Sequence, residues 1–439
     1  MRRYEKYRDS GVEWIGEIPE HWEVRKLKWV ISEKLKYGAN ESAELDNPNY
    51  PRYIRITDFS SEGKLKDDTF KSLLPEKAKE YILKKGDVLF ARSGATYGKT
   101  FLFNEGNMQA CYAGYLIKAT PKTSIILPEY LYFYTKSGSY DNWKNSVFIQ
   151  ATIQNIGADK YSTLPFSVPT LPEQTAIVNF LNYETHKIDH IITTRQKQIE
   201  LLKELKSSMI SRAVTKGIDP NVKMKDSGVE WIGEIPEHWE IMRLKYVVNM
   251  KSGDGITSEM IKEEEKYPVY GGNGLRGYFN SFTHDGTFIL IGRQGALCGN
   301  INYATEKFWA SEHALVCTPK IKVVINWLGE LLRVMNLNQY SVSAAQPGLS
   351  VENLKTLQIP FPRLSEQHQI VSHIEKRTAK IDTAISKYQR QIELLKEYRA
   401  SLITEAVTGK IDVRGEIGEY GREENIAIIE IFNEDNNIF

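Results

Sequence analysis

The sequence predicts an α+β protein with two mixed, β-rich globular domains. Two long antiparallel helices that form a coiled coil separate them, and the whole chain follows an internal pseudo-two-fold repeat. Three observations lead to this prediction. A helix-forming stretch with a seven-residue apolar step occurs twice at a constant offset of 193 residues. The segment DSGVEWIGEIPEHWE occurs unchanged at 9–23 and at 226–240. Between these repeats lie short apolar runs bounded by glycine and proline, which are typical of strands and turns.

The repeated segment comes first in each half of the chain. Proline, glycine and two tryptophans in so short a space favour a turn-rich docking element over a regular helix or strand. Each copy leads into a short amphipathic stretch, VRKLKWVI in the first half and IMRLKYVV in the second. We therefore expect a docking segment in front of each globular domain.

The two regions that follow differ in sequence but share the positions of their glycines and apolar runs. In LKKGDVLFARSGATYGKTFLF and THDGTFILIGRQGALCGNINY, a glycine precedes an apolar, β-prone run that ends at Arg92 or Arg293. This pattern predicts a buried strand that delivers an arginine into a glycine turn. Further strands are expected within 50–59 and 267–279. Each region closes on a matching stretch, IQNIGADKYSTLPFSVP or QPGLSVENLKTLQIPFP.

The repeated helical stretches share the identical run Gln198–Glu204 and Gln391–Glu397. Apolar residues recur in both with the a/d spacing of a coiled coil, although Arg195 and Tyr388 interrupt the seam. With roughly 40 residues each, the helices would span on the order of 60 Å. The expected seam residues are Leu181, Ile188, Ile192, Ile199, Leu202 and Met209 in the first helix and Ile374, Ile381, Ile385, Ile392, Leu395 and Leu402 in the second.

These landmarks divide the chain into five predicted parts. They are a first globular domain at 1–171, a first helix at 172–217, a second globular domain at 218–363, a second helix at 364–411 and an acidic tail at 412–439. We expect the tail to be solvated and frayed, although NIAIIEIF within it could also pair as a strand.

Composition is that of a soluble protein with two or three domains. The sequence contains neither an apolar run near 18 residues nor an apolar core at its start, so we expect no membrane span and no signal peptide. Its three cysteines lack metal-ligand or disulfide spacing, which favours the reducing cytoplasm. Outside the acidic tail the chain carries 55 Lys and Arg against 48 Asp and Glu, so the body is mildly basic.

Three fragments imitate catalytic sites, and none has the required context. Gly272–Gly277 spells GxGxxG, but turn and strand residues follow it where a dinucleotide site needs a helix. Asn47–Tyr50 resembles a methyltransferase loop without a glycine-rich AdoMet loop, and is more typical of a turn before a strand. Glu264–Lys266 contains the ExK of nucleases, yet EEEK is more typical of a solvated helix end. We predict no catalytic residues, no metal site and no cofactor.

The residues at the glycine turns are better suited to binding nucleic acid than to catalysis. Arginine can bind a guanine edge through two hydrogen bonds, and glycine lets the backbone approach phosphates. Alternatively, Arg92 and Arg293 could brace their domains by donating to local carbonyl groups. The candidate DNA-binding residues are Arg55, Arg92, Ser93 and Lys99 in the first domain and Asn273, Arg276, Arg293 and Gln294 in the second.

The order of these elements resembles that of the specificity subunit of type I restriction–modification systems. The resemblance rests on GVEWIGEIPEHW, a variable region and an LPEQ-type helix containing QIELLKE, all repeated, and covers about 9–411. YGGNGLRGYF and QPGLS also resemble parts of that family's target-recognition domains, whereas IQNIG at 153–157 departs from the corresponding pattern.

The resemblance implies a non-catalytic DNA reader that acts in defence against foreign DNA. Each variable region would be a target-recognition domain that reads one half-site of double-stranded DNA. The helices would hold the domains apart and dock two methyltransferase subunits and, through them, the endonuclease and translocase subunits. AdoMet, ATP and magnesium would bind those partners rather than this chain. Two alternatives remain open, a stand-alone DNA-modifying enzyme and a coiled-coil scaffold that does not bind DNA.

Overall fold

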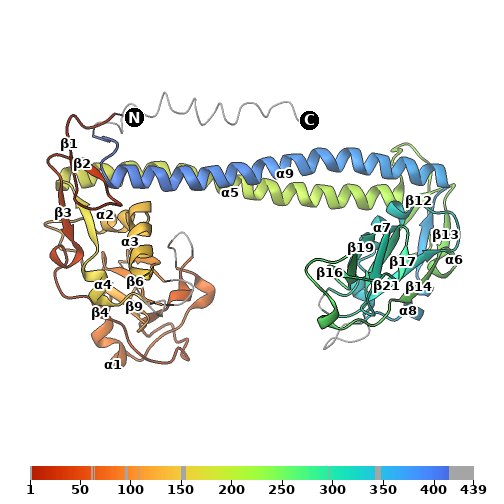
Figure 1. The fold of residues 1–439 in the computed structure, drawn as a ribbon, viewed down its shortest axis with the longest axis horizontal. Coiled ribbons are helices and arrows are strands. Elements are labelled where there is room, and N and C mark those ends of the chain that lie inside the picture. The colour runs from red at the N-terminus through yellow and green to blue at the C-terminus, as the bar shows by residue number, and fades with distance from the viewer. Residues whose placement is uncertain are drawn as a thin grey trace. The chain divides into compact units, whose positions relative to one another are not determined.

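The computed structural model describes residues 2–60, 63, 65–93, 97–106, 108–149, 155–295, 297–341 and 348–414. Their contacts divide the chain into two compact units. Unit 1 combines the residues up to Thr194 with those from Gln391 onward, and unit 2 runs from Arg195 to Arg390. The division falls inside both long helices, α5 (Leu171–Lys216) and α9 (Leu364–Val407), so each helix contributes one half to each unit (Figure 1).

The globular part of unit 1 contains short strands and helices. Its strands are β1 (Tyr7–Asp9), β2 (Glu17–Pro19), β3 (Glu23–Lys26), β4 (Lys36–Tyr37), β5 (Arg52–Ile54), β6 (Val88–Ala91), β7 (Thr100–Leu102), β8 (Ala110–Tyr112), β9 (Leu116–Ala119) and β10 (Pro165–Val168). Its α-helices are α1 (Pro75–Ala78), α2 (Pro128–Tyr134), α3 (Gly138–Ile149) and α4 (Ala158–Ser162). A four-stranded antiparallel sheet in the order β4-β9-β6-β7 forms its centre, and β5 pairs with β8 in parallel.

Unit 2 repeats this plan with an extended second sheet. Its strands are β11 (Met224–Asp226), β12 (Glu234–Pro236), β13 (Glu240–Arg243), β14 (Val248–Ser252), β15 (Tyr267–Gly271), β16 (Gly274–Phe279), β17 (His284–Asp285), β18 (Phe288–Gly292), β19 (Ile301–Ala304), β20 (Lys307–Ala310), β21 (Ala314–Pro319) and β22 (Gln358–Phe361). Its α-helices are α6 (Leu244–Val247), α7 (Ile325–Val334) and α8 (Val351–Thr356). The central sheet has the order β14-β21-β18-β19, and β15 pairs with β20 in parallel.

The two central sheets match strand for strand, which confirms the predicted repeated α+β fold. A close backbone crossing supports the match in detail. A Cβ at Gly38 would lie 2.2 Å from the carbonyl oxygen of Tyr112, and a Cβ at Gly253 would lie 2.2 Å from that of Ala310. No side chain fits at either position, so glycine follows β4 and β14 for the same steric reason.

Sequence patterns explain the central strands. Val88–Ala91 and Ile289–Gly292 are buried throughout, as expected for uninterrupted apolar runs. The predicted strand at 50–59 is shorter than the apolar pattern, because β5 ends at Ile54 and a 3-10 turn covers Ile56–Asp58. The stretch at 267–279 forms the hairpin of β15 and β16. Most of the acidic tail, 415–439, lies outside the described residues.

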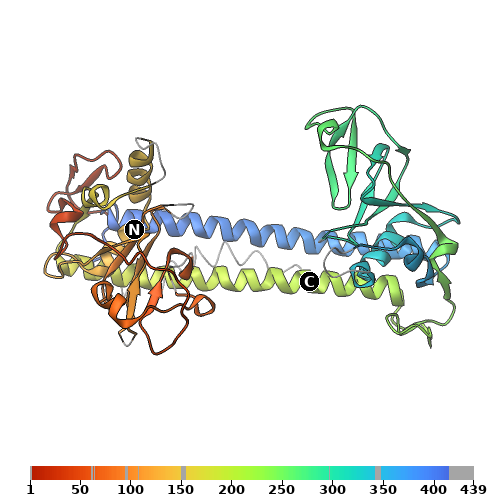
Figure 2. The ribbon, with the colours of Figure 1, turned by 90° about the horizontal axis from the view of Figure 1, so that it is seen from below.

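Helices α5 and α9 run antiparallel within each unit (Figures 1 and 2). Lys206 pairs with Asp382 at 2.6 Å in unit 2, and Arg399 pairs with Asp189 at 3.0 Å in unit 1. Seven of the predicted seam side chains are buried: Leu181, Ile188, Ile199, Ile374, Ile392, Leu395 and Leu402. The remaining five are half-buried: Ile192, Leu202, Met209, Ile381 and Ile385.

The interruption of the seam has a contact of its own. The guanidinium of Arg195 lies 4.6 Å from the ring centroid of Tyr388, within the range of a cation–π interaction. Both residues belong to unit 2. The two polar seam residues therefore pack on each other rather than leaving a gap.

Candidate functional site

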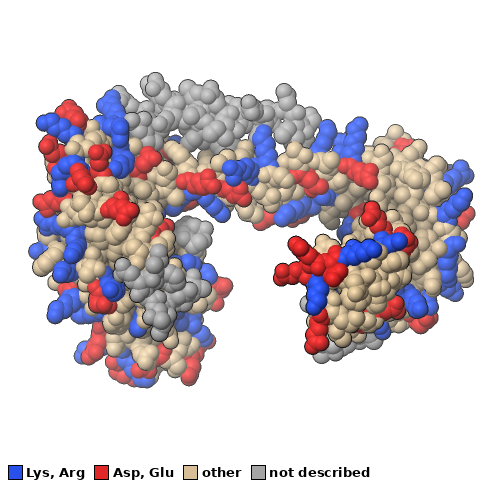
Figure 3. Space-filling model, in the orientation of Figure 1, with Lys and Arg blue, Asp and Glu red and all other residues tan. Residues whose placement is uncertain are grey.

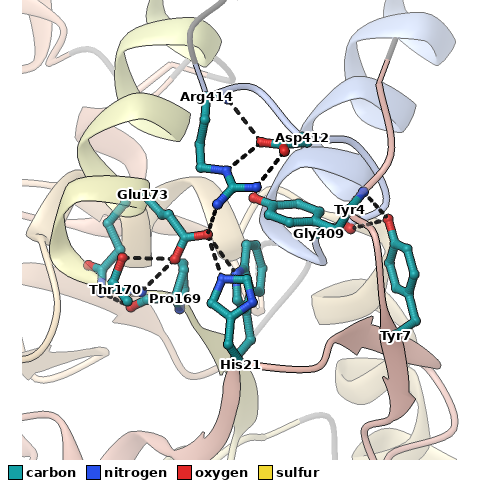
Figure 4. Close-up of polar contacts among 11 residues, drawn as sticks. Tyr4, Tyr7, His21, Pro169, Thr170, Glu173, Gly409, Asp412 and Arg414 are labelled. Atoms are coloured by element: carbon teal, nitrogen blue, oxygen red, sulfur yellow. Dashed lines mark hydrogen bonds and ion pairs between the residues drawn. The ribbon is translucent and has the colours of Figure 1, made fainter.

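The repeated docking segment of unit 1 binds the first turn of α5. Nε2 of His21 lies 2.8 Å from a carboxylate oxygen of Glu173, and Nε1 of Trp22 donates to the same oxygen at 3.2 Å (Figure 4). The hydroxyl of Thr170 donates to the other carboxylate oxygen at 2.8 Å. An acidic side chain also complements the positive end of the helix dipole at this position. The segment and the helix are thus joined through one carboxylate.

Unit 2 repeats this arrangement with the second copies of the same residues. Nε2 of His238 lies 3.0 Å from Glu366, and Nε1 of Trp239 donates to Glu366 at 2.9 Å. Trp22 and Trp239 are both about 1% exposed, so their indole rings belong to the cores. The docking role expected of the segment is therefore played by its last residues, His and Trp, against the Glu of each helix start.

The glutamine after each of these carboxylates holds the neighbouring loop. The side chain of Gln174 accepts from the amide of Leu127 at 2.7 Å and donates to the carbonyl groups of Ile125 and Pro169. Gln367 is its equivalent in unit 2, where it accepts from Val324 at 2.8 Å. Both glutamines are completely buried with their amides satisfied. Sequence reasoning missed this role, although the repeated Glu-Gln pair was its signal.

The opposite ends of the long helices meet the same docking segments. Gly409 follows α9 with φ of +71° and lies against Pro19 and Trp22, whereas Gly217 follows α5 with φ of +76° and lies against Trp239. Glycine tolerates this left-handed conformation and ends each helix there. Each segment therefore holds the start of one long helix and the end of the other.

Unit 1 adds a cluster that brings both ends of the described chain together. Arg414 pairs with Asp412 and lies over the ring of Tyr4 at 4.7 Å, and its guanidinium is 3.9 Å from Glu173. The hydroxyl of Tyr7 donates to the carbonyl of Gly409 at 3.1 Å (Figure 4). Burial raises the pKa of the Tyr4 hydroxyl far above its usual value, so Tyr4 remains neutral.

The carboxylate of Glu173 remains ionised in this setting. Its burial alone would raise its pKa, but the hydrogen bonds from His21, Thr170 and Trp22 outweigh that effect and hold the pKa below its ordinary value. A carboxylate with a lowered folded-state pKa stabilises the fold above its unfolded pKa. That contribution is lost as the pH falls through the folded pKa.

We expect Glu173→Gln to lower the free energy of unfolding by about 1–3 kcal/mol at neutral pH. The difference from the wild-type chain should shrink in acid, as the pH falls below the ordinary glutamate pKa and through the lowered pKa of Glu173. Urea unfolding at several pH values measures it, with the exposed Glu20→Gln of the same segment as control. A deficit that is independent of pH would contradict the role of the ionised carboxylate.

The predicted arginine of unit 1 lies where β6 leaves the central sheet. Its backbone amide donates to Tyr115 at 3.0 Å, and its carbonyl accepts from Ile156 at 2.8 Å. The guanidinium of Arg92 stacks over the ring of Tyr37 at 5.0 Å, and its Nε donates to Asn155 at 3.3 Å. The half-buried Arg92 is thus oriented by neighbours on three other segments.

Unit 2 places Arg293 in the equivalent position. Its amide donates to His313 at 2.9 Å, its carbonyl accepts from Leu349 at 2.9 Å, and its Nη1 donates to Ser252 at 2.9 Å. Ser93 and Gln294, which follow the two arginines, form matching backbone bridges to Asn155 and Gly348. IQNIG and QPGLS therefore occupy equivalent places despite their different sequences, although their residues 153–154 and 346–347 lie outside the described part of the chain.

These contacts define one edge of each unit, which is called the reading edge for the role proposed for it below. In unit 1 it consists of Tyr37, Arg92, Ser93, Tyr115 and Asn155, and in unit 2 of Ser252, Arg293, Gln294, His313 and Gly348. Sequence reasoning missed Tyr37, Tyr115, Ser252 and His313, because the paired positions hold different residue types and only the fold aligns them.

The other predicted DNA-binding residues lie in different settings. The guanidinium of Arg55 forms two hydrogen bonds with the buried Asp58 and a third with the carbonyl of Thr69 at 2.9 Å, so it braces its own loop. Lys99 is exposed after the turn that follows β6. Asn273 accepts from Asn300 at 2.7 Å, and Arg276 is exposed on β16 beside Gly271. Their contact with DNA stays a prediction.

The three fragments that imitate catalytic sites have structural roles. Gly274–Gly277 belongs to strand β16, with no helix after it. Asn47–Tyr50 forms a turn in front of β5. Glu264 and Glu265 are exposed in the connection to β15, which is a loop rather than the expected helix end.

Comparison with known proteins identifies the family of this chain. The model of the type I restriction modification DNA specificity domain matches twice, at residues 19–201 and 236–395. The two matches together cover most of the chain and coincide with its internal repeat.

The chain belongs to the specificity subunits of type I restriction–modification systems. Among its relatives, the putative MjaX specificity subunit of Methanocaldococcus jannaschii is 28% identical over 91% of this chain and 96% of that protein. The EcoprrI specificity subunit of Escherichia coli is 41% identical over 30% of this chain, an alignment that spans 33% of the relative's length. The prediction of a non-catalytic specificity subunit is thereby confirmed.

Solved structures share the fold. A chain from a study of the assembly and conformational transition of the type I R-M system gives a TM-score of 0.73 at 16% identity, over 90% of this chain and 99% of that one. The HsdS subunit of Thermoanaerobacter tengcongensis gives a TM-score of 0.52 at 18% identity, over 90% of this chain and 98% of its own.

The surface of this specificity subunit mixes charges of both signs. Lys and Arg are interspersed with Asp and Glu over both units on the face drawn in Figure 3. Within the described residues, no helix is long and apolar enough to cross a membrane.

Proposed function

We propose that this specificity subunit reads a bipartite DNA target, with one half-site for each reading edge, and scaffolds the catalytic subunits of its complex. The observation that supports this most is the equivalence of Arg92 and Arg293. Both leave the central sheet at the same point, and both are held by the carbonyl of the same turn. A repeated arginine with different neighbours suits the reading of two different short sequences.

The neighbours differ in chemistry as well as in shape. Tyr37 and Tyr115 present two exposed rings beside Arg92, whereas Ser252 and His313 present smaller hydrogen-bonding groups beside Arg293. Each edge would therefore accept a different arrangement of base edges in the major groove. Lys99, Asn273 and Arg276 would position the duplex through its phosphates, whereas Arg55 would support its loop.

The long helices support the scaffolding part of the proposal. Leu201 and Leu205 on α5 are exposed, and so are their equivalents Leu394 and Tyr398 on α9. Residues four apart lie on one helical face, so each helix presents an exposed pair at equivalent positions, two leucines on α5 and a leucine and a tyrosine on α9. Two copies of one partner fit this repetition, and we assign them to two methyltransferase subunits. The endonuclease and translocase subunits would join through these, in the cytoplasm.

The purified chain alone is expected to bind target DNA but to neither cut nor methylate it. Catalysis would belong to the partners, which would carry AdoMet, ATP and magnesium. Incubation with labelled duplex and AdoMet, or with magnesium and ATP, measures this, and addition of the methyltransferase subunit should restore methylation. Turnover by protein shown by mass spectrometry to be free of partners would contradict the proposal, as would the absence of DNA binding at low salt.

A further inference from the structure

A basic and aromatic surface recurs in both units at the opposite end of the central sheet from the reading edge. In unit 1, Trp29 is 64% exposed, and the ammonium of Lys28 lies 5.0 Å from its ring centroid. In unit 2, Tyr246 is 56% exposed, and Lys245 lies 4.9 Å from its ring. The same pair therefore occurs at the same place after the docking segment in both halves.

Two further cations belong to this surface in each unit. Lys122 donates its backbone amide to Val30 at 2.7 Å, and Lys320 donates to Val247 at 2.8 Å, so they are equivalent residues. Lys26 and Arg243 precede the aromatic residues by three positions. We define the basic platforms by these residues: Lys26, Lys28, Trp29 and Lys122 in unit 1, and Arg243, Lys245, Tyr246 and Lys320 in unit 2.

The cations of the platforms have no carboxylate partner. Among the described residues, none of the six forms an ion pair, and the nearby carboxylate of Glu23 pairs with Arg25 instead. The ammonium of Lys320 donates to the carbonyl of Lys245 at 2.9 Å, which holds two cations of the unit 2 platform together. In unit 1 the platform borders an open depression of about 590 Å³ lined by Val24, Arg25, Lys26, Lys28 and Trp29. An exposed aromatic ring matches the aromatic enrichment of protein–protein interfaces, and the cations beside it suit a partner with acidic groups.

The position of the platforms disfavours DNA as their ligand. Strand β9 begins next to Tyr115 of the reading edge and is followed by Lys122 of the platform, and β21 connects His313 and Lys320 in the same way. Seven extended residues span about 23 Å, so the platform lies at the far end of the strand from the bases that Arg92 or Arg293 would contact. Duplex DNA also offers no unstacked base to an exposed ring.

We propose that the two basic platforms are docking surfaces for a protein partner present in two copies, with acidic groups around an apolar pocket on its contact face. Two equivalent platforms require two equivalent ligands, and three cations require an acidic counterpart. Resting on the proposed function, the inference identifies this partner with the methyltransferase subunit and adds a contact outside the long helices.

The test is titration of the full chain with the methyltransferase subunit of its system, followed by native mass spectrometry and sedimentation. Lys28→Glu with Trp29→Ala should weaken one of the two bound copies about 30-fold, as expected for an interface hot spot. Adding Lys245→Glu with Tyr246→Ala should weaken both. The matched control is Phe282→Ala with Lys307→Glu, because Lys307 lies 4.9 Å from the ring of Phe282, which is also exposed.

The possible outcomes distinguish a failure of the platform proposal from a failure of the proposed scaffolding function. Failure of the wild-type chain to bind the methyltransferase would refute the scaffolding proposal itself. Equal binding of the methyltransferase subunit by the wild type and the platform variants would refute only the docking role of the platforms. Unchanged methyltransferase affinity with weaker, less salt-dependent DNA binding would identify them as phosphate contacts and also overturn the inference. Thermal unfolding of each variant verifies the fold, and Lys28→Ala provides a milder variant.

Discussion

Insertion of seven residues into each long helix, after Thr194 and after Arg390, is expected to lengthen the spacer between the two half-sites by about three base pairs. Seven residues add about 10.5 Å of helix, and B-DNA rises about 3.4 Å per base pair. A seven-residue insertion preserves the a/d register, so the seam would continue through it. Methylation mapping of the assembled complex measures the spacer, and both half-sites should remain unchanged.

Insertion of two residues at the same two places is the matched control. It rotates the seam by about 200° and breaks the register of the buried positions, so we expect an inactive or poorly assembled complex. An active complex that carries the seven-residue insertions and methylates only the original spacer would show that the helices do not set the distance.

Trp22→Ala and Trp239→Ala are each expected to lower the free energy of unfolding by about 3–5 kcal/mol. Each substitution removes a fully buried indole from a core and takes a hydrogen bond from Glu173 or Glu366. The glycine that ends the other helix also loses its packing partner. Because each docking segment holds both helices, the loss should appear as weakened helix pairing in hydrogen exchange.

Trp14→Ala and Trp231→Ala are the matched controls, because these half-buried tryptophans belong to the same two segments. We expect them to destabilise less. If Trp22→Ala costs no more than Trp14→Ala in urea unfolding, the indole–carboxylate contact does not fasten the segment to the helix.

The repeats made the architecture predictable. The helical period and the constant offset indicated the long helices, and the glycine before each apolar run indicated strands β6 and β18. The sequence predicted that the repeated segment docks, but not which of its residues make the contact. That His21 and Trp22 share Glu173 depends on long-range contacts that local patterns do not encode.

The candidate site was predictable only in part for the same reason. Arg92 and Arg293 stood out because each follows a buried strand and precedes a glycine turn. Tyr115 and His313 are different residue types, so the sequence does not align them. Their positions are equivalent because the carbonyl group of each accepts a hydrogen bond from the backbone amide of Arg92 or Arg293. Arg55 resembled a DNA contact in sequence, but a short turn places Asp58 against its guanidinium.

Methylation mapping with Arg92→Ala and Arg293→Ala in the assembled complex tests the central claim of one half-site per domain most directly. We expect each variant to lose about 1–3 kcal/mol of discrimination at a base pair of one half-site, with the other half-site read as before. The two variants should affect opposite halves of the target. Equal loss at both half-sites in either variant, or unchanged specificity with reduced thermal stability, would contradict the account.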